Sequence, residues 1–422
     1  MGFLIEGGKA LSGSVHISGA KNAVLPLMAA AILVKGQVKI QNTPQLDDVF
    51  CLMQVLESLG CNTELHKNLL TINSSLIDAV EPDPEMVSRM RASMLVLGAL
   101  LAVKGEVLMP MPGGCAIGNR PIDLHLKGLA QMGARMDWDE GRLRVTTPRG
   151  GLLGCRIYLD YPSVGATENL MMAAVKARGE TIIENSALEP EIADLAGFLR
   201  KAGAHITGEG TSILKIRGDE DLAPITYQVI PDRVEAGTFM LAGAITGGAI
   251  KLKPVCPEHL KAVTAKLREC GVKIKEGKQE IEVVAPREGK AINIKTMPYP
   301  GFPTDMQPQF MAYLSVAKGT SVITETVFEN RFMQVPEVLR MGAQIKTEGR
   351  TAIIYGTRKL FPATVMAPDL RAGAALVLAA LRAEGTTVVE CTEHIDRGYE
   401  SLQTKLSLLG AKIERITAPV AP

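Results

Sequence analysis

Aromatic residues are scarce in this 422-residue chain, where Phe, Tyr and Trp together make up 4%. An excess of either charge is also missing, because 46 Lys and Arg residues face 45 Asp and Glu residues and leave a formal net charge of +1. Nucleic-acid-binding proteins usually carry a basic surface, often with aromatic side chains that stack on bases. The composition therefore argues against a nucleic-acid partner, and any cationic residue that binds an anion must act locally.

Patterned cysteines and long apolar segments are missing as well. The seven cysteines follow no metal-ligand or disulfide spacing, which is typical of reduced thiols in a cytosolic protein. The longest apolar stretch, residues 94–103, has about half the length that spans a bilayer. The first residues match neither a signal peptide nor a myristoylation site. We therefore expect a cytoplasmic protein that does not bind membranes.

What the chain does have is a repeat marked by two sets of glycines. Glycines of the first set end a helix-like segment, and they lie 68–73 residues apart: Gly60, Gly133, Gly203, Gly271, Gly342 and Gly410. Glycines of the second set precede a short β-branched run 23–28 residues upstream: Gly36, Gly105, Gly179, Gly248, Gly319 and Gly385. Because both sets recur with nearly constant spacing over the whole chain, they indicate six copies of one structural repeat.

Each repeat shows the pattern helix, strand, helix, strand pair. The first helix, expected at 25–33, 94–102, 170–175, 239–245, 310–316 and 374–381, is apolar nearly all round and should be buried on all sides. The second helix is only half apolar and the strands alternate, so both should have a solvent-facing side. The sequence therefore predicts an α/β fold with helices inside and sheets outside.

The number of buried helices predicts two domains, because six such helices would exceed the usual size of one core. We expect residues 21–230 to form one barrel-like domain of three repeats. Residues 1–20 and 231–422 should form the other, with residues 1–20 as an extra hairpin around Gly7-Gly8 and Ser12-Gly13.

Unusual polar residues concentrate just before the two helices of each repeat. Before the first helix they are Lys21, Asn22, Arg89, Arg91, 163–167, Asp232, Arg233, Asp305, Asp369 and Arg371. Before the second helix they are Cys115, Arg120, Glu189, Glu191, Glu329, Arg331, Asp396 and Arg397. Helix N-termini attract anions, so packing around a pseudo-threefold axis would gather an anion site at one end of each domain. Two facing domains would then form a cleft for a small, multiply anionic substrate, although each residue alone could be a cap or a surface ion pair.

A glycine-rich segment within residues 111–121 predicts a mobile lid. Cys115 lies in this segment and Arg120 follows five residues later. A nearby cation lowers the pKa of a thiol, so Cys115 is a candidate acid or nucleophile. His125, at a helix start, is expected to cap the helix or contact a ligand rather than act as a base.

The segment 112–115 together with 120–123 resembles the lid of the UDP-N-acetylglucosamine 1-carboxyvinyltransferases, a family of enolpyruvyl transferases. Further segments are similar to this family's motifs, in family order over essentially the whole chain: 18–22, 90–93, 163–167, 189–192, 231–233, 303–307, 325–331, 369–371 and 394–398. The resemblance implies the same fold class, two inside-out α/β domains of three repeats.

The activity that this resemblance implies is enolpyruvyl transfer from phosphoenolpyruvate to the 3-hydroxyl of UDP-N-acetylglucosamine, with release of phosphate. This is the first committed step of peptidoglycan precursor synthesis, and it proceeds by addition and elimination without a metal or cofactor. In the family, the residue matching Cys115 is the general acid and can bond covalently to phosphoenolpyruvate. Asp305 would accept the hydroxyl proton, with Asp369 close by, and Lys21 and Arg397 complete the catalytic set.

The resemblance also implies substrate contacts. Lys21 and Asn22 match residues that hold phosphoenolpyruvate and the sugar. Arg120 and Arg397 match residues that hold phosphate and carboxylate, with Arg331 and Arg371 nearby. Nucleotide-sugar contacts match Arg91, Arg120, Pro121, Ile122, Asp123, Leu124, Ser163, Val164, Gly165, Asp305 and Val327.

One position departs from the family pattern. Several members have a lysine two residues before the serine that matches Ser163, whereas this chain has Tyr161. We expect this change to affect nucleotide affinity more than chemistry.

The repeat architecture is also compatible with three other kinds of protein. A shikimate-phosphate enolpyruvyl transferase has the same architecture, but Cys115 in this lid argues against it. A duplicated copy that binds UDP-sugar without catalysis stays open, and a nucleic-acid end-processing protein lacks the basic surface. The sequence does not indicate an oligomeric state.

Overall fold

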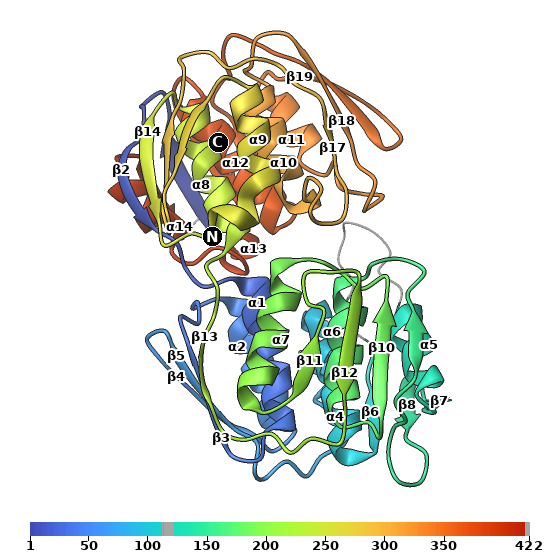
Figure 1. Cartoon of the computed structure of the whole chain (residues 1–422). Helices are drawn as coiled ribbons and strands as arrows, with labels where there is room; N and C mark the ends of the chain where they lie inside the picture. Colours follow the sequence, from blue (N-terminus) through green and yellow to red (C-terminus); the bar gives the residue numbers. More distant parts are fainter. Residues whose placement is uncertain (112, 114–121, 418–422) are drawn as a thin grey trace. The chain divides into compact units, whose positions relative to one another are not determined.

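The computed structural model describes residues 1–111, 113 and 122–417. The chain forms two compact units (Figure 1). The described residues 19–111, 113 and 122–230 make up the first unit, and residues 1–18 with residues 231–417 make up the second. The buried apolar side chains form one cluster in each unit. Each unit therefore has its own hydrophobic core.

Each unit contains three β-sheets, one for each expected repeat. The sheets of the first unit have the strand orders β13-β3-β5-β4, β6-β8-β7 and β11-β12-β10-β9. Their strands are β3 (Gln37–Gln41), β4 (Asn62–His66), β5 (Leu69–Asn73), β6 (Glu106–Met109), β7 (Arg135–Asp139), β8 (Arg142–Thr146), β9 (Arg156–Tyr158), β10 (Glu180–Glu184), β11 (His205–Thr207), β12 (Ile213–Arg217) and β13 (Thr226–Gln228).

The sheets of the second unit have the orders β15-β16-β14-β2, β17-β18-β20-β19 and β21-β22-β1-β23. Their strands are β1 (Gly2–Glu6), β2 (Ser12–His16), β14 (Ala249–Lys253), β15 (Lys273–Glu276), β16 (Ile281–Val284), β17 (Ile294–Lys295), β18 (Thr320–Thr324), β19 (Gln344–Glu348), β20 (Thr351–Tyr355), β21 (Thr364–Met366), β22 (Thr386–Glu390) and β23 (Lys412–Ile416). Five of the sheets carry a parallel edge strand supplied by a linking segment: β13, β9, β2, β17 and β21.

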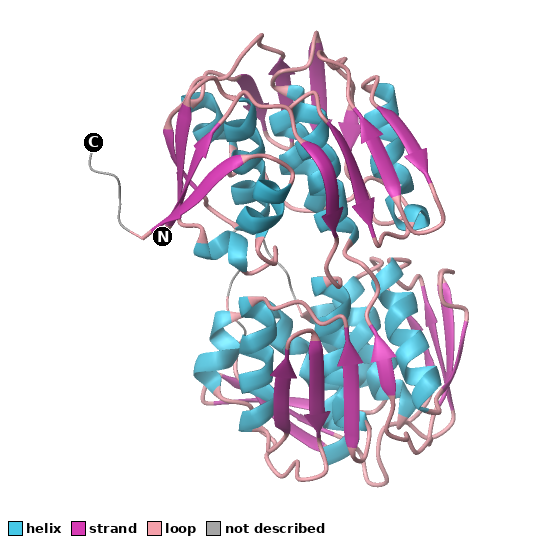
Figure 2. Ribbon diagram, turned by 90° about the vertical axis from the view of Figure 1, so that its left-hand side faces the viewer, coloured by secondary structure: helices cyan, strands magenta, loops and turns pink. Residues whose placement is uncertain are grey.

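The first helix of every repeat is buried within its unit, as its apolar pattern predicts (Figure 2). These helices are α1 (Lys21–Ala30), α4 (Val96–Lys104), α6 (Val164–Val175), α8 (Arg233–Ile245), α10 (Gln307–Leu314) and α12 (Leu370–Arg382). Nearly all of their side chains are inaccessible to solvent. The α/β class is confirmed, with the sheets on the outside of the helices in each unit.

The second helix of each repeat has a buried face, and it exposes more of its side chains than the first helix does, although α7 (Pro190–Ala202) is mostly buried. These helices are α2 (Asp47–Ser58), α5 (Asp123–Gln131), α7 (Pro190–Ala202), α9 (Lys261–Glu269), α11 (Val335–Arg340) and α14 (Leu402–Leu408). The remaining helices are short: α3 (Pro84–Arg89), α13 (Glu393–Asp396), η1 (Ala31–Leu33), η2 (Arg91–Leu95), η3 (Pro257–Leu260) and η4 (Thr304–Met306).

The two sets of glycines have distinct structural roles. The six glycines of the first set follow the second helices with φ between +86° and +122°, in the region that favours glycine. The six glycines of the second set each accept a backbone hydrogen bond, 2.8–3.4 Å long, from the residue after a neighbouring strand. The donors are Ser74, Thr147, Gly218, Ala285, Gly356 and Gly7.

The expected hairpin within residues 1–20 is wrong. Strand β1 lies between β22 and β23 and is antiparallel to both, whereas β2 joins a different sheet and runs parallel to β14. Up to residue 417, where the described chain ends, the sixth repeat has only β23 after its second helix, while each of the other repeats has at least two strands there. Strand β1 supplies the missing one, and Gly7 donates to Gly385 as its counterparts do in the other repeats.

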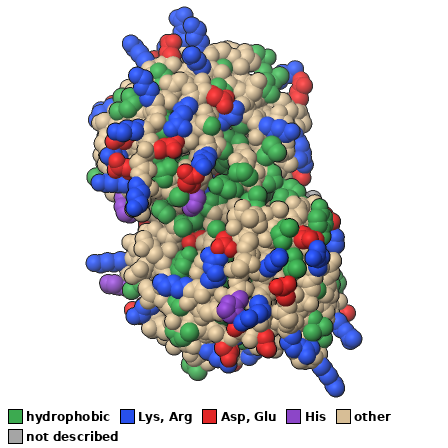
Figure 3. Space-filling view, viewed as in Figure 1, with side chains coloured by type: hydrophobic (Ala, Val, Ile, Leu, Met, Phe, Trp, Pro, Cys, Tyr) green, Lys and Arg blue, Asp and Glu red, His purple; other side chains and the backbone are tan. Residues whose placement is uncertain are grey.

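Charged side chains of both signs are interspersed on the face seen in Figure 3, without a continuous basic patch. This agrees with the formal net charge of +1. Among the described residues, no helix is both long enough and apolar enough to cross a bilayer.

Candidate active site

Each buried central helix begins at or just after a residue that the sequence singled out. Lys21 is the first residue of α1, and Arg91 begins η2, which leads into α4. Asp305 lies in η4, directly before α10. Ser163, Asp232 and Asp369 are the N-caps of α6, α8 and α12. The fold therefore places one candidate polar group at the start of every central helix, three in each unit.

In the second unit, Asp305 lies between two buried arginines. Arg331 Nη2 donates to Asp305 Oδ1 over 2.8 Å. Arg371 donates to the other oxygen, Oδ2, from Nη2 over 3.0 Å and from Nε over 3.2 Å. Both arginine side chains are 3% exposed, whereas Asp305 is 25% exposed. The carboxylate is therefore the accessible part of a buried cationic cluster.

The two guanidinium groups keep hydrogen-bonding capacity beyond Asp305. Arg331 Nε and Arg371 Nη1 are buried and have no hydrogen-bond partner among the described residues. The Arg371 guanidinium also lies over the ring of Tyr399, 5.3 Å from its centroid. Burial alone would lower the pKa of Arg371, but Tyr399, Asp305 and Asp232 outweigh burial and raise it above its usual range. Arg371 is therefore a permanent cation with a donor available for an anion.

Asp369 and Arg397 are each placed by the helix next to them. Asp369 Oδ1 accepts hydrogen bonds from the backbone N–H groups of Arg371 at 2.7 Å and of Ala372 at 2.9 Å. It thus fixes the first turn of α12, which carries Arg371, and so has the capping role that the sequence left open. Arg397 is half-buried and directly follows α13.

Val327 belongs to a loop that a buried carboxylate holds in place. Glu325, 1% exposed, accepts hydrogen bonds from the N–H of Val327 at 2.8 Å and from Thr296 Oγ1 at 2.7 Å through Oε1. Its Oε2 accepts from Thr304 Oγ1 at 2.9 Å. Because Thr304 precedes Asp305, Glu325 links the loop that carries Val327 to η4.

In the first unit, Lys21 forms a buried ion pair. Its Nζ lies 2.5 Å from Asp48 Oδ2, and the two side chains are 9% and 6% exposed. Asp48 comes from the first turn of α2. Asn22 is half-buried and follows Lys21 in α1. Because a buried charge requires a partner, Asp48 offsets the cost of burying the Lys21 ammonium at the start of α1.

The segment 163–165 forms the N-terminus of α6. Ser163 Oγ accepts a hydrogen bond from the N–H of Ala166 at 3.3 Å, and all three residues are half-buried. Free N–H groups at a helix start suit an anion. Tyr161 is 43% exposed just before this helix.

The residues 122–125 begin α5, next to the start of α6. Asp123 is exposed, whereas Ile122 and Leu124 are half-buried and His125 is 8% exposed. His125 Nδ1 lies 3.0 Å from Asn169 Nδ2 of α6. The positive charge of Arg91 helps to lower the pKa of His125, so the Arg91 side chain lies near this ring.

Cys115, Arg120 and Pro121 lie outside the described residues, as does most of the expected lid 111–121. Asp305, Arg331 and Arg371 are brought together in one unit, and His125 and Gly165 in the other. No group of three or more His, Cys, Asp and Glu side chains in the described ranges is arranged to hold a metal ion.

Three supporting residues were not identified from the sequence: Asp48, Glu325 and Asn169. Glu325 lies in a segment that resembles the family, but its pattern does not show that its side chain turns inward. Asp48 and Asn169 lie within helical stretches, where nothing in the spacing separates them from surface residues. Only their tertiary contacts reveal their positions.

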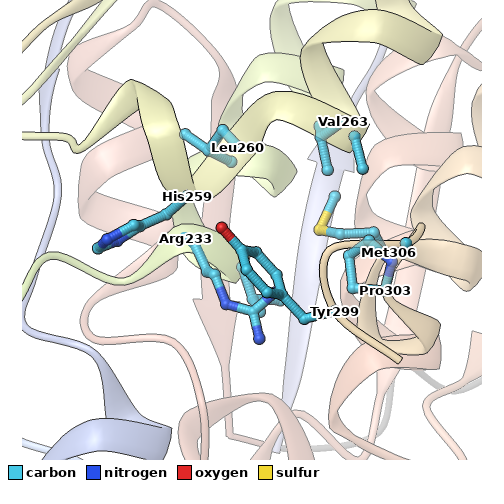
Figure 4. A pocket seen from close by; sticks show the side chains of 10 residues that line it. Arg233, His259, Leu260, Val263, Tyr299, Pro303 and Met306 are labelled. Atoms are coloured by element: carbon cyan, nitrogen blue, oxygen red, sulfur yellow. The ribbon is translucent and has the colours of Figure 1, made fainter. Parts of the chain in front are cut away.

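A small hollow lies beside η4 in the second unit (Figure 4). It is lined by Arg233, His259, Tyr299, Pro303 and Met306 among others, and the Arg233 guanidinium lies over the Tyr299 ring, 5.5 Å from its centroid. Its volume of about 10 Å³ admits at most one water molecule. This hollow cannot hold either expected substrate.

The fold, with polar residues at the starts of its central helices, is that of a known class of protein. Residues 5–406 match the family model described as EPSP synthase (3-phosphoshikimate 1-carboxyvinyltransferase). The enolpyruvyl transferase NikO from Streptomyces tendae has a similar structure, with a TM-score of 0.90 and 26% identity over 99% of both chains. EPSP synthase from Acinetobacter baumannii shares the fold at a TM-score of 0.76 and 21% identity, over 99% of this chain and 100% of that one. The chain belongs to the EPSP synthase family of enolpyruvyl transferases.

A curated relative is much more similar in sequence. The UDP-N-acetylglucosamine 1-carboxyvinyltransferase of Trichlorobacter lovleyi is 52% identical over 416 residues, which cover 99% of each chain. The relationship thus extends over the whole length of both proteins.

Proposed function

We propose that the protein transfers the enolpyruvyl group of phosphoenolpyruvate to the 3-hydroxyl of UDP-N-acetylglucosamine and releases phosphate. The observation that carries this proposal is the 52% identity over 99% of both chains to a relative with that named activity. The likeness to EPSP synthase, at 21% identity, concerns the fold alone. In this proposal the reaction is the first committed step of peptidoglycan precursor synthesis and takes place in the cytoplasm, which links it to cell shape and division.

The charges of the described residues support a substrate with a carboxylate and a phosphate. Arg331 and Arg371 each have a buried N–H group without a partner among the described residues, and Lys21 contributes a buried ammonium. Guanidinium groups bind carboxylate and phosphate well because several N–H groups converge on one anion. We propose that these residues, with Arg397 and Arg120, neutralise phosphoenolpyruvate, and that no cofactor takes part.

The proposed chemistry has two steps. In the addition, the sugar 3-hydroxyl oxygen bonds to C2 of phosphoenolpyruvate while C3 takes a proton from the Cys115 thiol, and Asp305 accepts the hydroxyl proton. In the elimination, the C2–O bond to phosphate breaks, C3 returns a proton to the Cys115 thiolate, and the hydroxyl proton held by Asp305 leaves with the phosphate, which gives the enol ether. Both oxygens of Asp305 accept hydrogen bonds from arginines, so an anion that draws one guanidinium away frees an oxygen for the incoming proton.

Residues of both units enter this proposal. Lys21, Asn22, Arg91 and the α6 start belong to the first unit, whereas Asp305, Asp369 and Arg397 belong to the second. A bond that forms with an acid on one side and a base on the other requires groups from opposite directions. We propose that both sets of residues act on the same pair of substrates.

Phosphate release from phosphoenolpyruvate tests the proposal, measured with and without UDP-N-acetylglucosamine for the wild type, Cys115→Ser and Cys155→Ser. We expect release only with both substrates, a collapse in Cys115→Ser, and little change in Cys155→Ser, the matched control. Release that survives in Cys115→Ser would remove the thiol from the mechanism. A wild type that releases phosphate with shikimate 3-phosphate, but not with the UDP-sugar, would overturn the proposed substrate.

A further inference from the structure

The side-chain amide of Asn169 has its orientation fixed by backbone groups. Asn169 Oδ1 lies 2.7 Å from the N–H of Gly98, and Nδ2 lies 3.0 Å from the carbonyl of Met94 and 3.3 Å from that of Gly165. A backbone N–H can only donate and a carbonyl can only accept. A flipped amide would oppose all three backbone groups, so Oδ1 faces Gly98 and Nδ2 faces the carbonyls.

The fixed amide in turn determines the tautomer of His125. His125 Nδ1 lies 3.0 Å from Asn169 Nδ2, which is a donor, so Nδ1 must accept. An imidazole whose Nδ1 accepts carries its proton on Nε2. His125 is therefore the Nε2–H tautomer, and its donor points away from Asn169.

His125 also stays uncharged. Its side chain is 8% exposed, and burial, followed by the charge of Arg91, lowers its pKa to about 4 against a smaller opposite effect of Asp123. The ring is thus neutral throughout the physiological range. It is held as a donor of one hydrogen bond rather than as a cation or an acid–base group.

The free edge of the ring lies beside the N-terminus of α6. A methyl group added at Gly165 would lie 3.3 Å from His125 Cε1 and 3.4 Å from Nε2, so the ring packs directly against this backbone. His125 Nε2 has no hydrogen-bond partner among the described residues. The helix start itself offers N–H groups to an anion. The donor of His125 and those N–H groups can therefore serve one ligand.

We propose that Asn169 is a positioning residue that locks His125 as the neutral Nε2–H tautomer, so that His125 donates to a pyrophosphate oxygen of the nucleotide sugar at the start of α6. This inference rests on the proposed function for the identity of the ligand. It adds a positioning role for Asn169. It also specifies that His125 donates from Nε2, as the neutral tautomer, to a pyrophosphate oxygen.

The variant Asn169→Asp keeps the shape and reverses the hydrogen bond. Oδ1 still accepts from Gly98, but the second carboxylate oxygen takes the place of Nδ2, where it faces His125 Nδ1 and also the carbonyls of Met94 and Gly165. It attracts a proton to Nδ1, and its repulsion from the two carbonyls should also lower the stability of this variant. The ring then becomes either the Nδ1–H tautomer, whose Nε2 repels a phosphate oxygen, or an imidazolium with two donors. The exposed Asn62→Asp is a matched control for the same change of charge within the first unit.

Nitrogen NMR of protein labelled with ¹⁵N-histidine reads the tautomer without any substrate. The chain has six histidines, and loss of a signal in His125→Gln assigns that of His125. We expect wild-type His125 to show a protonated Nε2 and an unprotonated Nδ1 from pH 6 to pH 8, and Asn169→Asp to show a protonated Nδ1. A wild-type ring protonated on Nδ1 would overturn the proposal.

Binding of UDP-N-acetylglucosamine and of UMP, measured by calorimetry, tests the ligand contact. Loss of one hydrogen bond to a charged oxygen should weaken binding of the UDP-sugar by about tenfold or more in Asn169→Asp and in His125→Leu. His125→Gln, which restores a donor at similar reach, should recover part of this loss, and Asn62→Asp should bind normally. UMP keeps the α-phosphate and lacks the β-phosphate, so UMP binding that weakens in the same variants assigns the contact to the α-phosphate, and UMP binding that stays normal assigns it to the β-phosphate.

Unchanged UDP-sugar binding in His125→Leu would overturn the contact even if Asn169→Asp failed to fold. A wild type that shows the expected tautomer but binds no UDP-sugar would overturn the proposed ligand and, separately, the proposed function.

Discussion

The cluster of Asp305, Arg331 and Arg371 holds buried hydrogen-bond donors in place for an anion before any ligand binds. Arg331 and Arg371 are almost completely buried, yet each retains an N–H group without a partner among the described residues. Leaving such donors unpaired costs about 1–3 kcal/mol each. A bound carboxylate or phosphate would recover that cost, so part of the binding free energy is already present in the unliganded protein.

Replacing Arg371 by lysine should separate charge from geometry. Lysine keeps the positive charge but cannot donate twice to Asp305 Oδ2 or lie flat over Tyr399. We expect kcat/KM for phosphate release to fall about 100-fold, which corresponds to about 3 kcal/mol. Arg358→Lys, at an exposed arginine of the same unit, is the control. An Arg371→Lys enzyme of normal kcat/KM would show that charge alone suffices.

A second residue-scale prediction concerns the pH dependence of stability. Glu168 is 3% exposed, its Oε1 has no partner among the described residues, and burial together with Glu191 and Glu189 raises its pKa well above the ordinary 4.5. The folded state therefore favours the protonated acid. Its contribution to stability is complete below pH 4.5 and is lost as the pH rises toward the folded-state pKa.

Glu168→Gln mimics the protonated acid at every pH. We expect it to match the wild type near pH 4.5 and to unfold at higher urea concentration at pH 8, with a gain of at least about 1 kcal/mol. Far-UV circular dichroism follows the unfolding, because Trp138, the single tryptophan, is 63% exposed in the folded protein and its fluorescence would change little. The exposed Glu180→Gln should show no such gain. Equal stability of Glu168→Gln and wild type at both pH values would contradict the burial argument.

At the scale of elements, the repeat depends on close contacts between strand ends and central helices. A Cβ at Gly356, just after β20, would lie 1.6 Å from the carbonyl oxygen of Ala317, which follows α10. The equivalent glycine after β12, Gly218, would meet Ala177 at 1.8 Å. Only glycine allows the sheet to approach the helix this closely.

Gly356→Ala should therefore destabilise the second unit by about 3 kcal/mol or more, because backbone rather than a side chain must move. Gly349→Ala is the control: it has φ +55°, but nothing lies within 4 Å of its added Cβ, so it bears conformational strain of about 1 kcal/mol without a clash. Thermal unfolding of the two variants compares these costs. A Gly356→Ala protein as stable as Gly349→Ala would contradict the close approach.

The elements also show what the sequence could predict. The apolar character of α6 and α12 and the glycine after each second helix follow from local preferences, so the repeats and the buried helices were predictable. The pairing of Gly2 with Glu390 and Ile416 was not predictable, because nothing local in residues 2–6 identifies partners about 400 residues away. For the same reason the contacts of Asp48, Glu325 and Asn169 were beyond sequence reasoning.

At the scale of the whole molecule, the first and the last strand of the described chain pair in one sheet. Gly2 of β1 lies opposite Ile416 of β23 in an antiparallel pair. A two-residue turn in place of Met1 and residues 417–422 would join these strands as a hairpin, and Asn-Gly suits such a turn. Reopening the chain between Ile230 and Pro231 would then make each unit contiguous in sequence.

This circular permutant should fold, and its second unit should refold faster than that of the wild type, because the pairing of β1 becomes local. Pulsed hydrogen exchange with mass spectrometry measures when the amides of β1 become protected during refolding. A permutant with the same turn but opened within the buried α12 should fail to fold. Protection of β1 at the wild-type rate would indicate that its pairing does not limit refolding.

The position of β1 also has a consequence for biosynthesis. On the ribosome, β1 emerges first, but both of its neighbours, β22 and β23, lie beyond residue 385. At roughly 5–20 residues per second, this strand waits about 20–80 s for its partners. The first unit is complete by residue 230 and can fold during that time. Nascent chains stalled before β22 should therefore contain one finished half and a tethered, unpaired strand of the kind that chaperones bind.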